Sequence, residues 1–293
     1  MTATETTTTT IPFLDVRALN ASIGEQLWLA VSEVAEQCDF IGGSAITAFE
    51  TEWARYCEVK HAIGVANGTD ALELALQALG IGAGDEVIVP TNTFIATAEA
   101  VSRTGAVPVF VDVDPCTLLI TADGIRAAIT SRTAAVAVVH LYGQIPDMDA
   151  IGRVASDYGI ALVEDAAQAH GATWLGRKAG SFGAVGCFSF YPGKNLGAWG
   201  DAGAVVTNDD AIASRVRMAA NHGATEARST CTPGSGATVG STLCKRPCSR
   251  RSLRFLTRGT SRGAHWSRTT GACSRGPACS SWLRQPARAA SIT

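Results

Sequence analysis

A lysine in a loop rich in glycine is the strongest candidate for chemistry in this sequence. Lys194 follows an apolar run at residues 185–190 and stands between Gly193 and Gly197. A surface lysine needs no such setting, whereas an enzyme that forms a Schiff base needs an amine held in place. We therefore predict that Lys194 is a nucleophile that reacts with a carbonyl carbon. The hydroxyl of Ser189, just before the loop, is then a candidate for binding a phosphate group.

A second candidate group ends another apolar run. Glu164 and Asp165 follow residues 160–163, and Gln168 comes three residues after Asp165. A carboxylate in this place can form an ion pair with a protonated pyridine nitrogen, and a glutamine amide can hydrogen-bond a phenolic oxygen. The alternative for Asp165 is an ordinary helix cap. These residues alone leave both interpretations open.

Two shorter motifs follow other predicted strands. Asn67-Gly68-Thr69-Asp70 precedes a helical pattern, so that Gly68 permits a ligand to approach while Thr69 and the helix amides hold a phosphate. An Asn-Gly turn followed by an Asp cap explains the same residues equally well. Phe94 places an aromatic ring beyond another strand, although a phenylalanine taken alone is more often part of a core.

Strand and helix patterns alternate through most of the chain. Continuous apolar runs separated by helical segments are typical of a parallel sheet covered by helices on both faces. Because ligands bind at the carboxyl ends of such strands, we expect the four motifs at one edge of the sheet. Strands are predicted at residues 62–66, 86–89, 107–111, 134–139, 160–163, 185–190 and 202–207. Helices are predicted at residues 23–38, 44–56 with Ser44 as N-cap, 71–79, 95–103, 125–129, 148–158 and 210–220.

Charge and cysteine divide the chain into two unlike parts. Residues 1–226 hold 12 Lys and Arg against 26 Asp and Glu, a net charge of −14. Residues 227–293 hold the other 12 basic residues and no acid, a net charge of +12, together with five of the nine cysteines. The cysteines of the first part show no pairing pattern, which favours a reducing compartment. No apolar run is long enough to cross a membrane, and the Thr-rich start has no targeting pattern, so we expect a cytoplasmic protein.

Taken together, the motifs resemble the DegT/DnrJ/EryC1/StrS family of sugar aminotransferases. The resemblance covers roughly residues 11–228, and the motifs occur in the family's order and approximate spacing. It implies the type I fold of transferases that use pyridoxal 5'-phosphate (PLP), like that of aspartate aminotransferase, and a homodimer with active sites at the subunit interface. The segments that carry it are Asn67–Asp70, Thr93-Phe94, Glu164–Gln168, Ser189–Asn195 and Gly200–Gly203.

The resemblance also implies a role for each candidate residue. Lys194 would hold PLP covalently and shuttle a proton, and Asp165 would pair with the pyridine nitrogen. Gln168 would contact the ring hydroxyl, and Phe94 would stack on the ring. No metal ion has a part in this scheme. The residues implied to hold the cofactor phosphate are Gly68, Thr69 and Ser189.

The implied reaction moves an amino group from glutamate to a nucleotide-linked keto sugar. Residues 140–144 resemble family members that aminate the 3-keto position of a dTDP-deoxyhexose in amino-sugar and antibiotic pathways, although members acting at the 4-keto position share most of the motifs. Related dehydratases carry histidine in place of the lysine, so Lys194 favours transamination. A PLP-dependent sugar dehydratase and a non-catalytic regulatory member are the alternatives. Neither nucleic acid nor membrane is an expected partner.

The family's pattern stops near Arg228. We expect a flexible arm at residues 1–22, a large PLP-binding domain at 23–228, and a basic tail at 229–293 that is out of frame and disordered, with the small domain missing or scrambled. Read one base out of frame, residues 236–249 permit codons for the sequence that the family has there. A nucleic-acid arm or a zinc site is the alternative, but the cysteine spacing fits no ligand pattern. Resequencing the DNA at residues 228–230 tests the frameshift: an unbroken frame whose codons exclude the shifted sequence would remove it.

Overall fold

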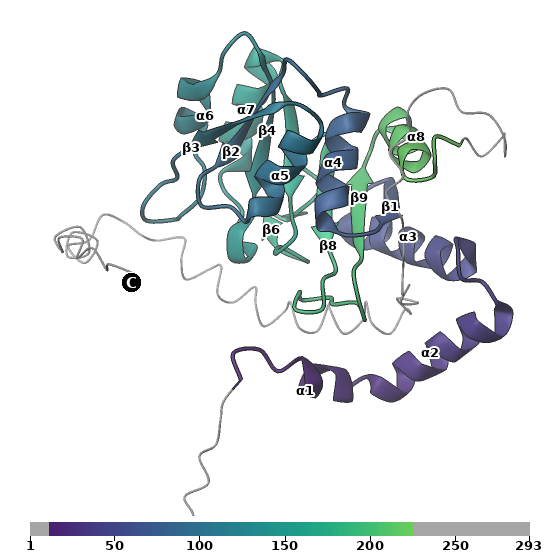
Figure 1. Ribbon diagram of the computed structural model, residues 1–293. Coiled ribbons are helices and arrows are strands. Elements are labelled where there is room, and N and C mark those ends of the chain that lie inside the picture. Colours follow the sequence, from purple (N-terminus) through teal and green to yellow (C-terminus); the bar gives the residue numbers. More distant parts are fainter. Residues whose placement is uncertain (1–11, 225–293) are drawn as a thin grey trace, which may run out of the picture.

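The computed structural model describes residues 12–224, and its centre is a seven-stranded sheet in the order β1-β9-β8-β5-β4-β2-β3 (Figure 1). Neighbouring strands from β8 to β3 are parallel, whereas β9 is antiparallel to both β8 and β1. β1 therefore runs in the same direction as β8, and within this sheet β9 alone runs the opposite way. The strands are β1 (His61–Val65), β2 (Glu86–Pro90), β3 (Val107–Val111), β4 (Thr133–Val139), β5 (Ala161–Asp165), β8 (Val185–Ser189) and β9 (Gly203–Thr207).

Helices cover both faces of this sheet. α4, α5 and α8 pack on one face, and α3, α6 and α7 pack on the other. At the N-terminus, α1 and α2 extend away from the sheet (Figure 1). The helices are α1 (Val16–Ala21), α2 (Gly24–Gln37), α3 (Gly43–Cys57), α4 (Gly68–Ala78), α5 (Ile95–Arg103), α6 (Ala122–Ala128), α7 (Met148–Tyr158) and α8 (Asp210–Ala219), with a 3₁₀ turn at Leu141–Gly143.

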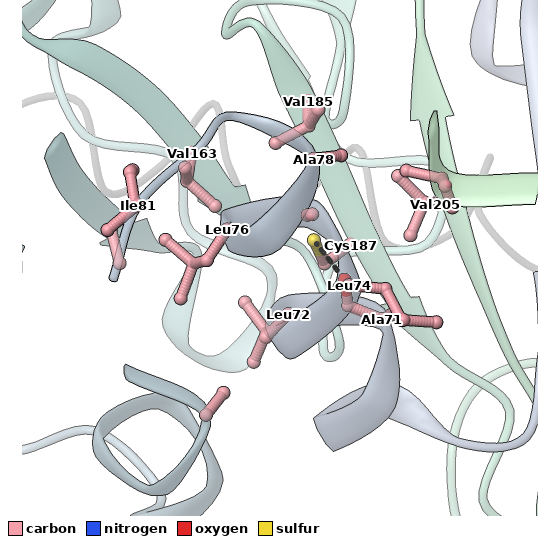
Figure 2. Packing of buried hydrophobic residues seen from close by; sticks show 14 of the residues in the cluster. Ala71, Leu72, Leu74, Leu76, Ala78, Ile81, Val163, Val185, Cys187 and Val205 are labelled. Atoms are coloured by element: carbon pink, nitrogen blue, oxygen red, sulfur yellow. Dashed lines mark hydrogen bonds between the residues drawn. The ribbon is translucent and has the colours of Figure 1, made fainter. Parts of the chain in front are cut away.

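Alternate residues of each strand supply two different cores. In β2, Val87 and Val89 pack with α4 and α5, whereas Ile88 between them packs with α6 and α7. Figure 2 shows the first core, in which Leu74 of α4 lies near Cys187 of β8, and the Cys187 thiol donates to the Ala71 carbonyl at 3.5 Å. Because successive strand side chains point to opposite faces, a one-residue shift would exchange the two cores. Packing on both faces thus fixes the register that aligns the strand ends.

The predicted α/β architecture with a mostly parallel sheet is confirmed, and each predicted strand and helix has a counterpart displaced by a few residues at most. Ser44 is not the cap of α3, which was a wrong prediction: the N-cap is Gly42, and the Ser44 N–H donates to Asp39 Oδ2 at 2.9 Å. A hairpin of β6 (Thr173–Trp174) and β7 (Arg177–Lys178) has strands too short to show alternation in the sequence.

The described residues include only part of the three segments predicted from the sequence. The predicted N-terminal arm, residues 1–22, contains α1 within its described portion. The predicted tail at residues 229–293, including the frameshift junction and the scrambled small domain, lies outside the described residues. Between residues 12 and 224, the structure has no helix that combines the length and the apolar character needed to span a membrane.

Candidate active site

The candidate residues meet at one edge of the sheet, because β1, β2, β4, β5 and β8 share a direction and end there. Two glycines make close contacts there. A Cβ atom on Gly68 would lie 2.6 Å from the Ser189 Cβ, and one on Gly203 would lie 2.3 Å from the Asn67 carbonyl oxygen. Gly68 and Ser189, which are 121 positions apart in the sequence (189 − 68), are therefore in contact.

The start of α4 forms one wall of this edge. Its N-cap is Asn67, whose side-chain oxygen accepts from the Asp70 N–H at 2.8 Å, so that Asn67 and not Asp70 supplies the cap. Gly68 and Thr69 occupy the first two helical positions, where amide groups have no partner inside the helix. Such amides and the positive end of the helix dipole favour an anion. This wall is suited to a phosphate group.

Asp165 ends β5 and is buried at the same edge. One oxygen, Oδ2, accepts from the Thr97 hydroxyl at 2.7 Å, and the other, Oδ1, accepts from the Ala167 N–H at 3.1 Å. Residues 166–172, which follow Asp165, form turns and no helix, so a helix cap does not account for this carboxylate. The sequence gives no signal for Thr97, on α5, because only the tertiary structure brings it to Asp165 at the end of β5.

Lys194 stands in the loop between β8 and β9, residues 190–202, which we call the lysine loop. A turn sets its position, with the Lys194 N–H donating to the Tyr191 carbonyl at 2.8 Å. The side chain is half-buried, and burial lowers the pKa of its ammonium group from the usual value, while the Asp165 carboxylate acts in the opposite direction. A lowered pKa increases the fraction of uncharged amine, which is the nucleophilic form.

The two remaining candidates border the site differently. The Oε1 atom of Gln168 accepts from the Tyr142 N–H at 2.8 Å, so its Nε2 group is the donor that it can offer to a ligand. Phe94 stands just before α5 and is 68% exposed, which leaves its ring face accessible. Phe94 is therefore outside the core, contrary to the expectation for a phenylalanine considered alone.

Beneath the edge lies a buried carboxylate whose role the sequence does not show. Glu164 accepts hydrogen bonds from the backbone N–H groups of Gly180 (2.7 Å), Phe182 (2.6 Å) and Gly183 (2.7 Å). It also pairs with the Nε2 atom of His140 at 2.9 Å, and both side chains are fully buried. The adjacent residue, Asp165, accepts from the His140 backbone N–H at 3.0 Å. Glu164 thereby fastens the end of β5 to two neighbouring segments.

A comparison with known families decides how this arrangement is classified. The model of the DegT/DnrJ/EryC1/StrS aminotransferase family matches residues 21–241. The chain belongs to this family. The match begins ten residues later and ends 13 residues further along than the resemblance in the sequence motifs, and it contains every candidate site residue.

Individual family members agree with this assignment. The chain is 49% identical over 220 residues to the dTDP-3-amino-3,4,6-trideoxy-alpha-D-glucose transaminase of Streptomyces venezuelae, covering 73% of this chain and 56% of that protein. The structure of S. venezuelae DesV in complex with a ketimine intermediate matches with a TM-score of 0.80 and 44% identity, over 86% of this chain and 67% of that one. The structure of NtdA from Bacillus subtilis with bound cofactor PMP has a TM-score of 0.74 and 34% identity, covering 80% and 53%.

These likenesses confirm the predicted type I fold of PLP-dependent sugar aminotransferases for the described domain. The chain spans less than two thirds of the length of the curated relatives that it matches. The activity of the whole protein is therefore a matter for proposal.

Contact between Gly68 and Ser189 leads to a first prediction about stability. Gly68→Ala introduces a Cβ atom 2.6 Å from the Ser189 Cβ, which forces the start of α4 and the end of β8 apart. We expect the free energy of unfolding to fall by about 1–3 kcal/mol, measured by urea denaturation. The control is Gly152→Ala in α7, where a Cβ meets nothing within 4 Å. The free energy of unfolding of Gly152→Ala should rise by roughly 0.4–1 kcal/mol. An equal change in Gly68→Ala would contradict the contact with Ser189.

His170 adds a pH dependence to the stability of the site. It is fully buried beside Trp53 and Phe188, its Nε2 atom lies 2.9 Å from the Ser189 carbonyl, and burial lowers its pKa to about 4. As the pH falls, the unfolded chain takes up a proton near pH ~6.5, whereas the folded chain resists protonation until about 4. The stability that neutral His170 allows is therefore fully present above the pKa of the unfolded chain, and it is lost as the pH falls toward the pKa of the folded chain.

We expect this histidine to cost about 2 kcal/mol of stability between pH 7 and pH 5. Urea denaturation at both pH values measures the loss. His170→Phe keeps an aromatic ring in the pocket but cannot titrate. Between pH 7 and pH 5 this variant should therefore lose about 2 kcal/mol less stability than the wild type. Identical pH dependence in the two proteins would exclude His170 as the source.

Proposed function

We propose that this protein is a PLP-dependent aminotransferase that moves an amino group from glutamate to a nucleotide-linked keto-deoxysugar. The observation that carries the proposal is Lys194, a half-buried amine of lowered pKa at the same sheet edge as Asp165. In this family, a lysine at this position favours transamination over the dehydration that histidine serves. The chain's membership of an aminotransferase family supports the same reaction.

The residues at the edge fit PLP. The Gly68–Ser189 contact brings the Ser189 hydroxyl beside the first amides of α4, and a hydroxyl and free helix amides together suit a phosphate. Asp165 offers a carboxylate to a pyridine nitrogen, and the Nε2 group of Gln168 offers a donor to a ring hydroxyl. The exposed ring of Phe94 offers a face for stacking. PLP, when bound in this way, supplies an electron sink for the electrons of a breaking C–H bond.

The protein's own groups then have distinct tasks. Asp165, held by the Thr97 hydroxyl, would favour a protonated pyridine nitrogen and orient the ring. The Nζ atom of Lys194 would hold the cofactor and would serve as the base and acid that moves a proton between two carbon atoms. Its lowered pKa favours the uncharged form that can accept this proton. Ser189 and Thr69 would hold the phosphate.

For the acceptor sugar we propose a 3-keto-6-deoxyhexose linked to dTDP, in an amino-sugar or antibiotic pathway. Support comes from the motif at residues 140–144 and from the name of the S. venezuelae relative, a dTDP-3-amino sugar transaminase. Tyr142 in this motif is 77% exposed and its N–H donates to Gln168, which we propose contacts the cofactor. Family members act at other positions as well, and the 3-keto position is the specific part of this proposal.

We also propose a homodimer with the active site near the subunit interface. α2 and the segment after it expose large apolar side chains, among them Trp28 and Ile41. A second subunit would cover them, and analytical ultracentrifugation tests this directly. A cytoplasmic location remains part of the proposal, since Cys38, Cys57 and Cys187 carry free thiols.

Two half-reactions test the function. The full chain is loaded with PLP and mixed with glutamate, and the visible absorbance of the lysine-bound cofactor is expected to disappear as 2-oxoglutarate forms. Addition of dTDP-3-keto-6-deoxyglucose should then restore the absorbance and yield an amino sugar. A deoxygenated sugar without a new amino group would indicate the dehydratase instead. PLP binding without either half-reaction would indicate the regulatory alternative.

The domain limits remain proposals that accompany this function: an arm at residues 1–22, a PLP-binding domain at 23–228 and a basic tail at 229–293. The described domain contains all seven candidate residues, so PLP binding can be tested on the chain as written. Restoration of a shifted reading frame after residue 228 would provide the comparison protein. A large gain in turnover on restoration is expected if the tail is out of frame.

A further inference from the structure

The N-terminal helices contact the lysine loop, although the sequence separates the two by well over a hundred residues. The Nε1–H group of Trp199 donates to the Asn20 side-chain oxygen at 3.1 Å. The Trp199 and Trp28 rings meet edge to face with centroids 5.2 Å apart. In Figure 1 the loop between β8 and β9 extends beyond the sheet on the side where α1 and α2 lie.

A third contact reaches the residue next to Lys194. A Cβ atom built on Gly193 would lie 3.0 Å from the Cδ2 atom of Leu14, so the Leu14 side chain rests against the backbone at Gly193. Leu14, Asn20 and Trp28 therefore touch the loop at Gly193 and at Trp199, on either side of Lys194 in the sequence. We call these five residues the arm contact.

Backbone hydrogen bonds anchor the lysine loop at its base. The Phe190 N–H donates to the Ala202 carbonyl at 2.7 Å, and the Ala198 N–H donates to the Phe190 carbonyl at 2.6 Å. The part that carries Lys194 projects beyond these bonds, and Tyr191, Gly193 and Asn195 in it are exposed. An exposed loop segment loses conformational entropy when it is held in one shape, and a contact from outside the loop lowers that cost.

We infer that the arm contact fixes the lysine loop, and that Trp199 is a positioning residue for Lys194. The inference rests on the proposed function only in giving Lys194 a reaction to perform. Trp199 has no contact with the reacting atoms in this scheme. It acts by holding the loop against α1 and α2, so that the Lys194 amine remains at the edge where Asp165 and Ser189 lie.

Amide hydrogen exchange on the cofactor-free full chain tests the contact itself. Loss of one hydrogen bond should speed exchange of the amides between residues 193 and 199 by roughly threefold to tenfold in Asn20→Ala or Trp199→Phe. In the double variant these amides should exchange at the rate seen in either single variant, because each substitution removes the same hydrogen bond. Leu29→Ala is the control, since Leu29 follows Trp28 on α2 and is 67% exposed. Unchanged exchange in Asn20→Ala and Trp199→Phe would overturn the inference.

The rate at which Lys194 captures added PLP, followed by visible absorbance in a stopped-flow instrument, tests the consequence. We expect capture to slow roughly tenfold in Trp199→Ala and less in Trp199→Phe, which keeps the ring contact, while the melting temperature of Trp199→Phe stays near that of the wild type. Equal capture rates in all variants would overturn the positioning role. Failure of the wild type to capture PLP would instead count against the proposed function, and the exchange experiment would still judge the arm contact.

Discussion

Lys194→Ala is expected to abolish the visible absorbance of bound PLP and to lower turnover by at least ~10³-fold, because the variant loses both the covalent attachment and the group that transfers the proton. The lysine is half-buried at the sheet edge, with its pKa lowered by burial. No neighbouring side chain in the described site can replace it, since Asp165 and Ser189 carry no amine. Absorbance spectra and the glutamate half-reaction measure the two losses separately.

Two matched variants make this prediction specific. Lys194→Arg keeps a positive charge but cannot form a Schiff base at pH 7, so it should lose the absorbance as completely as Lys194→Ala. Lys60→Ala removes an exposed lysine that pairs with Asp210, at 2.5 Å, and should leave both the absorbance and the turnover near wild type. Retention of absorbance and turnover in Lys194→Ala would disprove the assignment of this residue.

The second large effect concerns stability. Glu164→Gln should lower the free energy of unfolding by about 3–5 kcal/mol, because an amide NH₂ group would replace one oxygen in a fully buried site that presents only donors. Three of those donors are backbone N–H groups, which cannot rotate away or change role. His140 is the fourth, and its Nε2 atom must donate because the carboxylate already accepts at both oxygens.

Urea denaturation gives the size of this loss, and Glu99→Gln on α5 is a control outside the Glu164 network. The control should change stability by less than ~0.5 kcal/mol. Because Glu164 is next to Asp165, folded Glu164→Gln should also bind PLP more weakly than the control. A loss below about 1 kcal/mol would show that the buried network is not needed to hold the end of β5.

Several features of the fold follow directly from local patterns in the sequence. The run at residues 86–89 predicts β2, because a strand buried along its whole length needs mostly apolar residues. The run at residues 107–111 predicts β3, which lies at the edge of the sheet and is only partly buried. Helical periodicity places α7 correctly at both ends. The N-cap of α3 was missed, since Asp39 reaches the helix from five residues before Ser44 and a preference for serine at caps does not show such a contact.

Some residues of the site could likewise be predicted from the sequence, and others could not. Lys194, Asp165 and Gly68 each follow a predicted strand, and strand ends are where a parallel sheet gathers its functional residues. Thr97 lies within a helix, where a threonine carries no local sign of a role, and its bond to Asp165 spans 68 positions. Trp199 likewise gains its importance from Asn20, across 179 positions. Long-range partners of this kind cannot be read from spacing alone.

The sequence by itself determined the family and the order of the strands along the chain, and it singled out the residues that we propose bind a phosphate, a pyridine ring and a carbonyl carbon. These depend on residue type and short-range spacing, which local sterics and hydrogen bonding dictate. Tertiary structure alone decided that β9 enters between β1 and β8, that Gly68 touches Ser189, and that Glu164 is enclosed by donors. Those contacts arise when apolar faces are buried, and burial joins segments according to shape and not according to their distance in the sequence.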